Sequence, residues 1–459
     1  MSEVLVIGGG AAGMMAAIAA AKNGHHVVLA EKNEKLGKKV YITGKGRCNL
    51  TNNADLDVIL ANVVSNPRFL YSSLYGFTNQ DMIKMMNEAG LETKVERGNR
   101  VFPVSDKSSD VIKTLTGLLK KYGVDIRLHT EAQSLILEKD ASGIYTCRGA
   151  VLGQVSGNER SRGQAGSHDK GHDKGNHISH DNGISCLKQD AGANGPGRTW
   201  KQLADVTIVA CGGISYPLTG STGDGYRFAE SAGHQITDLS PGLVPFVTKE
   251  DWVPELQGLA LRNVKVQITA GKKKLYEEFG EMLFTHFGVS GPAVLSGSSI
   301  CARQLKKRGE LTLHIDLKPA LDEHTLDERL LREFKDARNK QIRNVAGSLY
   351  PSSLVPIMLR VSGIPEDKPI HDITRQERAA LIANTKDLRI TLTGLRGYNE
   401  AIITQGGVKV KEIDPATMES KLVPGLRFAG EVLDVDAMTG GYNLQIAWST
   451  GWAAGSTIE

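Results

Sequence analysis

The strongest constraint on the fold of this chain is a glycine-rich turn that joins an apolar strand to a helix. Residues 4–7 (VLVI) form a short β-branched run, which predicts a buried parallel strand. The sequence GGGAAG follows at 8–13, and an Ala- and Met-rich segment at 14–23 predicts a helix that ends at Gly24. Strand, glycine turn and helix in this order predict the first βαβ unit of a dinucleotide-binding fold.

Each position of this turn has its own task in such a fold. The first glycine permits a tight turn, the second lets backbone amides approach a pyrophosphate, and the third lets the helix pack closely on the strand. A second predicted strand, at 26–30, ends where such folds place an acid that accepts hydrogen bonds from a ribose. The candidate cofactor-binding residues here are Gly8, Gly10, Ala12, Gly13, Glu31 and Lys32.

Length and composition predict a protein of two or three domains. The chain has 459 residues and a net charge of only +4, from 55 basic and 51 acidic residues, which predicts no nucleic-acid partner. No apolar run reaches the roughly 20 residues that span a bilayer, and a secretory signal fails because glycines interrupt residues 4–21 and no basic region precedes them. Five scattered cysteines without a CxxC motif favour a reduced, cytoplasmic protein.

Two segments after the first βαβ unit are candidates for ligand contact. In TGKGRCNLTN at 43–52, glycines alternate with hydrogen-bond donors, as in a loop wrapped against a polar ligand, although an ordinary surface loop is the alternative. Cys48 taken alone is more often structural than reactive. A predicted strand at 124–128 is followed by Thr130–Ala132, where the backbone of doubly wound folds meets the adenine side of a cofactor.

The stretch at 153–198 breaks the globular pattern. It is rich in Gly, Ser, Asn, Asp and Lys and has almost no large apolar residue, so it predicts a disordered loop between two strands. Its histidines offer metal capture only as a minor alternative, because nothing fixes their geometry. They are His168, His172, His177 and His180.

The remaining chain predicts a third buried strand, an inserted domain and, at the end, a second copy of the pattern of strand, glycine turn and helix. The strand at 205–210 leads into Gly212 and Gly213, and TGDG at 222–225 opens a helix; tight packing without a ligand is the alternative. From 245 to 400, we expect a second domain with a β-barrel or meander at 244–247, 264–269, 274–279 and 311–317. A loop at 284–292, three helices at 325–346, 352–361 and 374–383, and strands at 388–393 and 400–404 complete it.

Near the end of the chain, a strand at 426–431 runs into Gly430 and Glu431, and TGGYNL at 439–444 precedes a helix at 445–454. A glycine pair at a helix N-terminus can aim amides at an electron-rich carbonyl edge, which would suit a flavin ring.

Together these blocks resemble the YhiN-like family of bacterial flavoproteins, often labelled aminoacetone-oxidase-type FAD-binding enzymes, which includes a 3-dehydro-bile acid Δ4,6-reductase. The matching blocks are the glycine turn at 8–13, TGKGRCNLTN at 43–52, GGISYPLTGSTGDGY at 212–226, LFTHFGVSGP at 283–292 and GEVLDVDAMTGGYNLQIA at 430–447. The stretch at 153–198 lies beyond the family's pattern.

The resemblance implies an α/β fold with a Rossmann-like FAD-binding domain of the glutathione-reductase and fumarate-reductase type. Residues 1–244 and 401–459 would form this domain, and 245–400 would form an inserted β-barrel plus three-helix domain. Glu31 would then hold the adenosine ribose, and Glu431 would face the ribityl chain. The resemblance assigns further cofactor contacts to Arg47, Cys48, Asn49, Ala132, Gly430, Gly441, Asn443 and Leu444.

We expect a flavin-dependent reductase of a small molecule, in which NADH or NADPH reduces FAD transiently and hydride passes to a C=C bond conjugated to a carbonyl. A 3-oxo-4,6-diene bile acid or steroid is the substrate that the resemblance suggests. Tyr216 and His286 are the candidate catalytic proton donors, each with a purely structural role as the alternative. An oxygen-using FAD-dependent amine oxidase and a non-catalytic flavin redox sensor remain alternatives, and the sequence indicates no oligomeric state.

Overall fold

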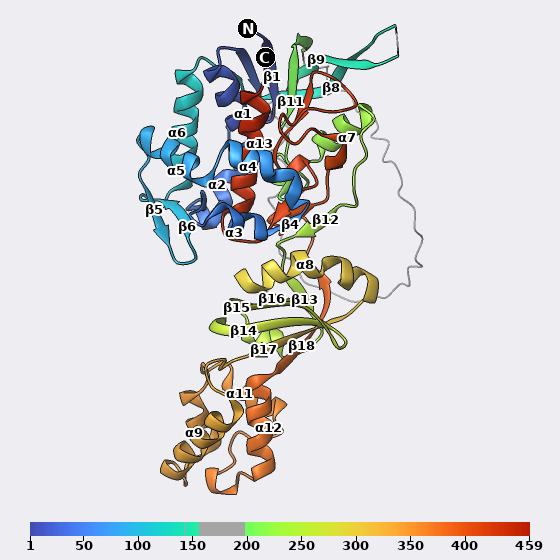
Figure 1. Ribbon diagram of the computed structural model, residues 1–459. Coiled ribbons are helices and arrows are strands. Elements are labelled where there is room, and N and C mark those ends of the chain that lie inside the picture. Colours follow the sequence, from blue (N-terminus) through green and yellow to red (C-terminus); the bar gives the residue numbers. More distant parts are fainter. Residues whose placement is uncertain (142, 156–197) are drawn as a thin grey trace, which may run out of the picture.

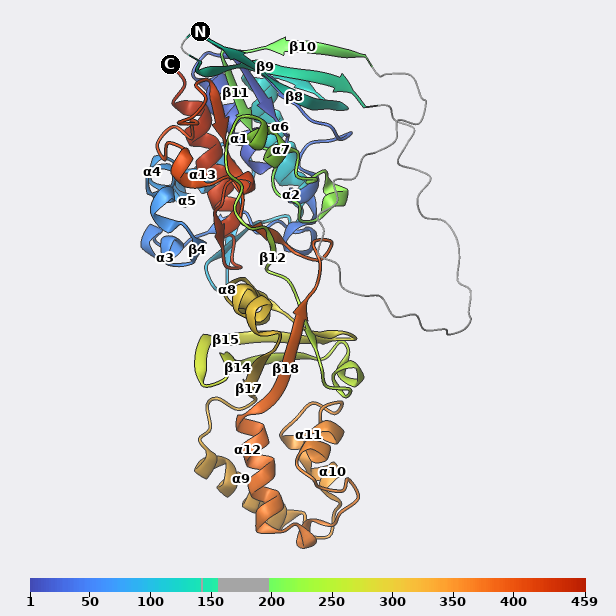
Figure 2. The same cartoon turned by 90° about the vertical axis from the view of Figure 1, so that its right-hand side faces the viewer.

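The computed structural model describes residues 1–141, 143–155 and 198–459. The four histidines and all but the ends of the predicted loop at 153–198 lie outside these residues. The described chain forms three units in a row, with the glycine-turn domain at one end, a barrel in the middle and a group of helices at the other end (Figures 1 and 2).

The first domain is built on a five-stranded parallel sheet in the order β20-β11-β1-β2-β7. Its central strand is buried on both faces, with Leu5 and Val6 fully buried, as expected of a continuous apolar run. The strands are β1 (Glu3–Ile7), β2 (His26–Ala30), β7 (Asp125–Arg127), β11 (Val206–Val209) and β20 (Leu426–Phe428).

The two ends of the chain meet inside this domain, where α1 (Ala11–Lys22) packs against α13 (Tyr442–Ser456). Small residues allow the contact, since a Cβ at Gly451 would lie 2.3 Å from the Ala12 carbonyl oxygen. The predicted Rossmann-like FAD-binding fold is therefore confirmed, and the first and last segments of the chain build it together.

Smaller elements surround this sheet. A three-stranded antiparallel sheet consists of β8 (Thr130–Lys139), β9 (Tyr145–Gln154) and β10 (Thr199–Leu203). The sequence did not predict β10, because its residues are mostly polar or exposed. The other elements of the domain are α2 (Lys38–Ile42), β3 (Thr51–Asn52), α3 (Leu56–Ala61), β4 (Val63–Ser65), α4 (Tyr71–Gly76), α5 (Asn79–Glu88), β5 (Thr93–Glu96), β6 (Arg100–Pro103), α6 (Ser108–Lys121), α7 (Asp224–Ser231) and β21 (Asp436–Ala437).

The inserted segment contains a closed six-stranded barrel. The sequence predicted either a barrel or a meander, and the structure has the barrel. Its strands follow the order β13-β16-β15-β14-β17-β18, and α8 (Pro292–Arg308) lies between the barrel and the first domain (Figure 2). The strands are β13 (Phe246–Thr248), β14 (Ala260–Ala270), β15 (Lys273–Thr285), β16 (Gly288–Ser290), β17 (Leu311–Asp316) and β18 (Leu388–Leu395).

Two sequence predictions in this segment need correction. The predicted loop at 284–292 contains a hairpin, in which β15 runs to Thr285 and the chain returns as β16. The predicted helix at 325–346 is in fact two helices, α9 (Glu323–Asp336) and α10 (Ile342–Val345), separated by a polar turn. The sequence predicted one helix because the apolar spacing continues across this turn. The other helices are α11 (Val355–Val361) and α12 (Arg375–Lys386), and the pair β12 (Ser240–Gly242) and β19 (Ile403–Gln405) joins the barrel to the first domain.

Candidate cofactor and substrate site

A cavity of about 1030 Å³ lies between the carboxyl edge of the parallel sheet and the barrel. This volume is at the upper end of the range for small-molecule and cofactor sites. The lining begins at the glycine turn and Glu31, continues along residues 43–49, and ends at the N-terminus of α13 and barrel residues 278–283. Segments from both ends of the sequence and from the insert therefore share one site.

The glycine turn has the geometry that the sequence predicts. A Cβ at Gly8, where φ is +105°, would lie 2.6 Å from the Ala210 carbonyl oxygen, and a Cβ at Gly13 would lie 1.8 Å from the Gly8 carbonyl oxygen. A Cβ at Gly10 would meet nothing within 4 Å, because this glycine opens onto the cavity in front of α1. No side chain caps the N-terminus of α1, so its amides suit the diphosphate of a dinucleotide.

Glu31 lies in the cavity wall and is only 7% exposed. Its Oε2 accepts a hydrogen bond from the Gly9 amide at 2.8 Å, and its Oε1 accepts from the backbone and side-chain nitrogens of Asn33. Oε1 thus uses both of its lone pairs, whereas Oε2 keeps one for a ribose hydroxyl. The neighbouring Lys32 lines the cavity too, and its Nζ lies 2.5 Å from Asp224 Oδ2.

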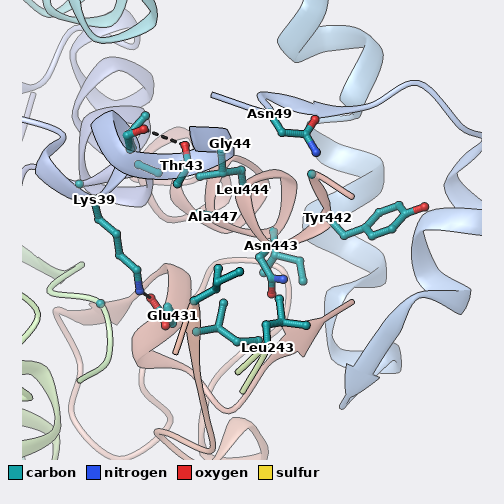
Figure 3. Close-up of a pocket in the computed structure, with 18 of the residues that line it drawn as sticks. Lys39, Thr43, Gly44, Asn49, Leu243, Glu431, Tyr442, Asn443, Leu444 and Ala447 are labelled. Carbon is teal, nitrogen blue, oxygen red and sulfur yellow. Dashed lines mark hydrogen bonds and ion pairs between the residues drawn. The ribbon is translucent and has the colours of Figure 1, made fainter. Parts of the chain in front are cut away.

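Glu431 joins three segments at the middle of the cavity (Figure 3). The Lys39 Nζ lies 2.6 Å from its Oε2, while its Oε1 accepts from the Ser215 hydroxyl at 2.9 Å and from the Thr404 amide at 2.7 Å. Sequence reasoning missed Lys39, which stands in α2 outside every quoted block. This ion pair positions the acid that the family resemblance assigns to the ribityl side.

The N-terminus of α13 forms the next part of the wall (Figure 3). A Cβ at Gly441 would lie 2.5 Å from the Thr51 carbonyl oxygen, so only glycine fits this approach. The Asn443 side chain accepts from the Ala437 amide at 2.9 Å and donates to the Ala437 carbonyl at 2.7 Å, which fixes the preceding loop. No side chain caps the helix, and Asn443 and Leu444 line the cavity.

The loop at 43–52 contributes Arg47 and Asn49 to the cavity wall, but not Cys48. Arg47 makes ion pairs with Glu96 and Asp106, and its guanidinium lies 4.2 Å from the centre of the Phe102 ring. Asn49 Oδ1 is buried, and no partner for it exists among the described residues. It can accept a hydrogen bond from a bound group.

Cys48 and two of the predicted glycines lie behind the lining. The Cys48 thiol is fully buried, and this burial raises its pKa to about 12, so it is not a reactive group. Gly13 and Gly430 serve packing, because a Cβ at Gly430 would lie 2.7 Å from the Cβ of Ala12. Ala132 and Ala12 do line the cavity, as predicted.

Neither predicted proton donor lines the cavity. Tyr216 is half-buried in the segment before α7, has a φ of +51°, and donates its backbone N–H to the Tyr398 carbonyl. His286 is exposed in the β15–β16 turn, where its ring packs on Phe287.

The structure brings a different phenol to the cavity. Tyr442 lines it, and burial together with the charge of Glu278 raises the pKa of this tyrosine. Glu278 comes from β15 and lines the same cavity. Tyr442 stands within the TGGYNL block, whose glycines predicted only a role for its backbone amides.

These features fit FAD. The glycine turn leaves open space at a helix N-terminus, Glu31 is fixed at the wall, a second uncapped helix faces the cavity, and Asn49 offers an unpaired buried acceptor. Glu31 would hold the ribose, the α1 amides the diphosphate, and the α13 amides the flavin pyrimidine. The fold and the site thus define an FAD-dependent oxidoreductase.

Comparison with known proteins identifies the family. The HI0933-like protein Rossmann domain matches residues 2–181, and the HI0933-like protein barrel and H2TH domain matches residues 240–403. The chain belongs to the HI0933-like family, which agrees with the YhiN-like resemblance.

Two curated relatives carry different names. The chain is 30% identical to the 3-dehydro-bile acid delta(4,6)-reductase of Clostridium scindens over 429 residues, 94% of this chain and 91% of the relative. It is 32% identical to the ribosomal RNA dihydrouridine synthase of Escherichia coli over 458 residues, 99% of this chain and 98% of the relative.

Among solved structures, the 3-ketosteroid delta1-dehydrogenase of Sterolibacterium denitrificans shares the fold, with a TM-score of 0.53 and 14% identity, over 99% of this chain and 98% of that one. Within residues 1–141, 143–155 and 198–459, no helix has both the length and the apolar character to cross a bilayer. The same residues contain no group of three His, Cys, Asp or Glu side chains that could hold a metal.

Proposed function

We propose that this protein reduces a carbon–carbon double bond conjugated to a carbonyl, with NADH or NADPH as the transient reductant. The names of the relatives support this chemistry. One is a delta(4,6)-reductase of a 3-dehydro bile acid, and the other makes dihydrouridine in ribosomal RNA. The pyrimidine bond that is saturated in dihydrouridine is conjugated to a ring carbonyl, as the double bonds of a 3-oxo-4,6-diene are.

The observation that carries the proposal is the mixed character of the cavity wall. The sheet side is polar and built from backbone turns, whereas the barrel side adds apolar side chains from β15, from α8 and from the segment between β12 and β13. They include Leu243, Met282, Leu283, Pro292 and Leu295. An apolar wall with few polar groups is suited to bind a planar enone and to exclude water.

When bound, FAD would supply the hydride donor. The chain itself must then hold the enone, polarise its carbonyl and deliver a proton. Tyr442 is our candidate for the proton, because its phenol lines the cavity and its raised pKa keeps it protonated near pH 7. Glu278, from the barrel, helps to keep this pKa high.

Two candidate substrates share this chemistry but differ in how they would enter the cavity. A 3-oxo-4,6-diene bile acid or steroid would enter the apolar end of the cavity as a free small molecule. A uridine would enter as part of an RNA strand, whose phosphates need cations outside the cavity. The identities of 30% and 32% give neither relative's substrate an advantage. We expect the reaction to run in the reduced cytoplasm, from the scattered cysteines.

An anaerobic experiment tests the proposal. The flavin absorbance of the holoprotein is followed after addition of NADH or NADPH, and then a 3-oxo-4,6-diene steroid, a uridine-containing RNA or oxygen is added separately. Bleaching by a nicotinamide and rapid recovery with either enone is the expected result. Recovery with oxygen alone, together with bleaching by an amine, would favour the amine oxidase. No bleaching by any donor would favour the non-catalytic redox sensor.

A further inference from the structure

A second hollow of about 510 Å³ adjoins the cavity on the barrel. Its lining consists of Arg262, Asn263, Phe279 and residues 317–321. Phe279 also lines the main cavity, so the two hollows meet at this ring. The ring is 56% exposed, although phenylalanine is among the residues most often fully buried. An aromatic side chain thus stands uncovered at the boundary between the two.

A β-bulge shapes this hollow. In the β14–β15 pair, Leu261 faces Met282 and Val264 faces Gly280, so Arg262 and Asn263 together stand opposite the single residue between those partners. Asn263 has a φ of +57°, which marks the local distortion. In a regular strand, consecutive side chains point to opposite faces. The bulge brings both side chains into one hollow, and bulges of this kind often re-aim a side chain next to a site.

The cations here lack acidic partners. Among the described residues, neither Arg262 nor Lys318 makes an ion pair. The rim of the main cavity carries three more cations without an acidic partner in the described part of the chain, namely Lys45, Arg97 and Arg100.

Two carboxylates lie nearby in the main cavity. They are Glu278, which accepts from the Tyr276 hydroxyl, and Glu281. Burial and the charge of Arg329 lower the pKa of Lys318, and the opposing charge of Glu333 offsets this only in part. An anion next to this ammonium would stabilise its charged form. Because the cations that lack an ion pair within the described chain outnumber these two carboxylates, the surface around the mouth of the cavity favours an anion.

We propose that the second hollow binds the nucleotide next to a reacting uridine in single-stranded RNA, with its base stacked on Phe279 and its phosphates on Arg262 and Lys318. Exposed aromatic rings beside cations are the usual components of single-strand binding sites. A base inside the cavity stays joined to its strand, so a cationic, aromatic surface must begin at the mouth. A free steroid ends within the cavity and requires no such surface.

This inference rests on the proposed function, since uridine is one of the enones that it covers. It differs from the prediction of no nucleic-acid partner, which came from the net charge of +4. Net charge averages over the whole chain, whereas a binding surface depends on local, unpaired charges.

The test uses the holoprotein and a labelled single-stranded RNA of about ten nucleotides that contains uridine. Its affinity is measured by fluorescence anisotropy over a range of salt concentrations. Phe279→Ala is expected to weaken binding about tenfold, and Phe279→Trp to restore it. Arg262→Gln is expected to weaken binding severalfold and to lower the slope of log K against log salt by about one.

Lys272→Ala provides the matched control, because this exposed residue lies in the β14–β15 turn and lines neither hollow. It should change neither the affinity nor the slope, and FAD content is measured for every variant. Wild-type affinity in Phe279→Ala, or no RNA binding by the wild type at low salt, would overturn the inference.

The two proposals fail in distinguishable ways. If Phe279→Ala loses affinity for the dienone steroid and no variant binds RNA, the hollow holds part of a small molecule and the RNA inference is wrong. If RNA binds through Phe279 but no enone reoxidises the reduced flavin, the RNA surface stands and the reductase proposal fails.

Discussion

The two sides of the cavity are built in different ways. On the sheet side, charged groups inside the cavity are paired, such as Lys39 with Glu431 and Arg47 with Asp106, and only the rim carries cations that are unpaired within the described chain. Glycines there allow backbone to approach backbone. On the barrel side, Phe279 is exposed and Arg262 has no ion pair among the described residues. The sheet side is thus complete enough to hold one fixed cofactor, whereas the barrel side leaves contacts for a partner to make.

The largest expected loss of stability and FAD binding comes from a substitution of Gly13, and Gly10 in the same turn is its comparison. Gly13→Ala places a Cβ 1.8 Å from a backbone oxygen, so we expect a stability loss of at least about 1–3 kcal/mol and almost no bound FAD. Gly10→Ala places its Cβ in open cavity, so the apoprotein should keep its Tm and lose only FAD affinity.

Thermal unfolding of the apoproteins and flavin titration measure the two effects. An equal loss of Tm in both variants would show that the turn serves folding alone, which would remove the distinction between packing and cofactor approach.

Tyr442→Phe tests whether the phenol at the N-terminus of α13 takes part in the chemistry. Removal of the hydroxyl should lower kcat by about a hundredfold or more, because a general acid typically contributes that much. The pH profile should also change, since the raised pKa of this phenol belongs to the lost group. Tyr216→Phe and His286→Ala are the controls, because neither residue lines the cavity. A Tyr442→Phe enzyme with normal kcat and pH profile would assign the proton to another group.

Lys39→Met breaks the ion pair on the sheet side. It leaves Glu431 with its hydrogen bonds from Ser215 and Thr404 but without its cation. We expect FAD affinity to fall about tenfold, since loss of a bond to a charged group costs roughly 1.5–3 kcal/mol. Flavin titration measures this change, with Lys35→Met as the matched control, because this exposed lysine lies just before the same helix and does not line the cavity. Equal affinities in the two variants would contradict the role of the pair.

Asn49→Ala is expected to have the smallest effect on FAD affinity. It should affect the apoprotein and the FAD-bound protein in opposite ways. The apoprotein should be as stable as the wild type or slightly more stable, because a buried unpaired acceptor is removed. FAD affinity should fall severalfold if the cofactor supplies the missing donor. A loss of apoprotein stability without a change in FAD affinity would show that Asn49 serves the fold instead.

Most of the sheet side could be predicted from the sequence. Gly8, Gly10, Glu31 and Glu431 stand at the cavity or its turn because strand ends and helix starts are local patterns. Cys48 and Gly430 stand in equally recognisable blocks but lie behind the wall, since a motif does not show which of its side chains faces inward. For the same reason, the loops of Tyr216 and His286 could be recognised in the sequence, but not that both side chains lie outside the cavity lining.

The sequence by itself determined the α/β class, the dinucleotide-binding turn and an inserted domain of strands and helices, because each depends on periodicity or on glycines that local backbone geometry requires. The flavin, the barrel and the family followed from the resemblance of whole motifs. Only the tertiary structure decided which side chains meet across the cavity. Lys39 reaches Glu431 over 392 positions, and β15 brings Glu278 to Tyr442 from another domain. Such contacts depend on how distant elements pack, and no local pattern in the chain records them.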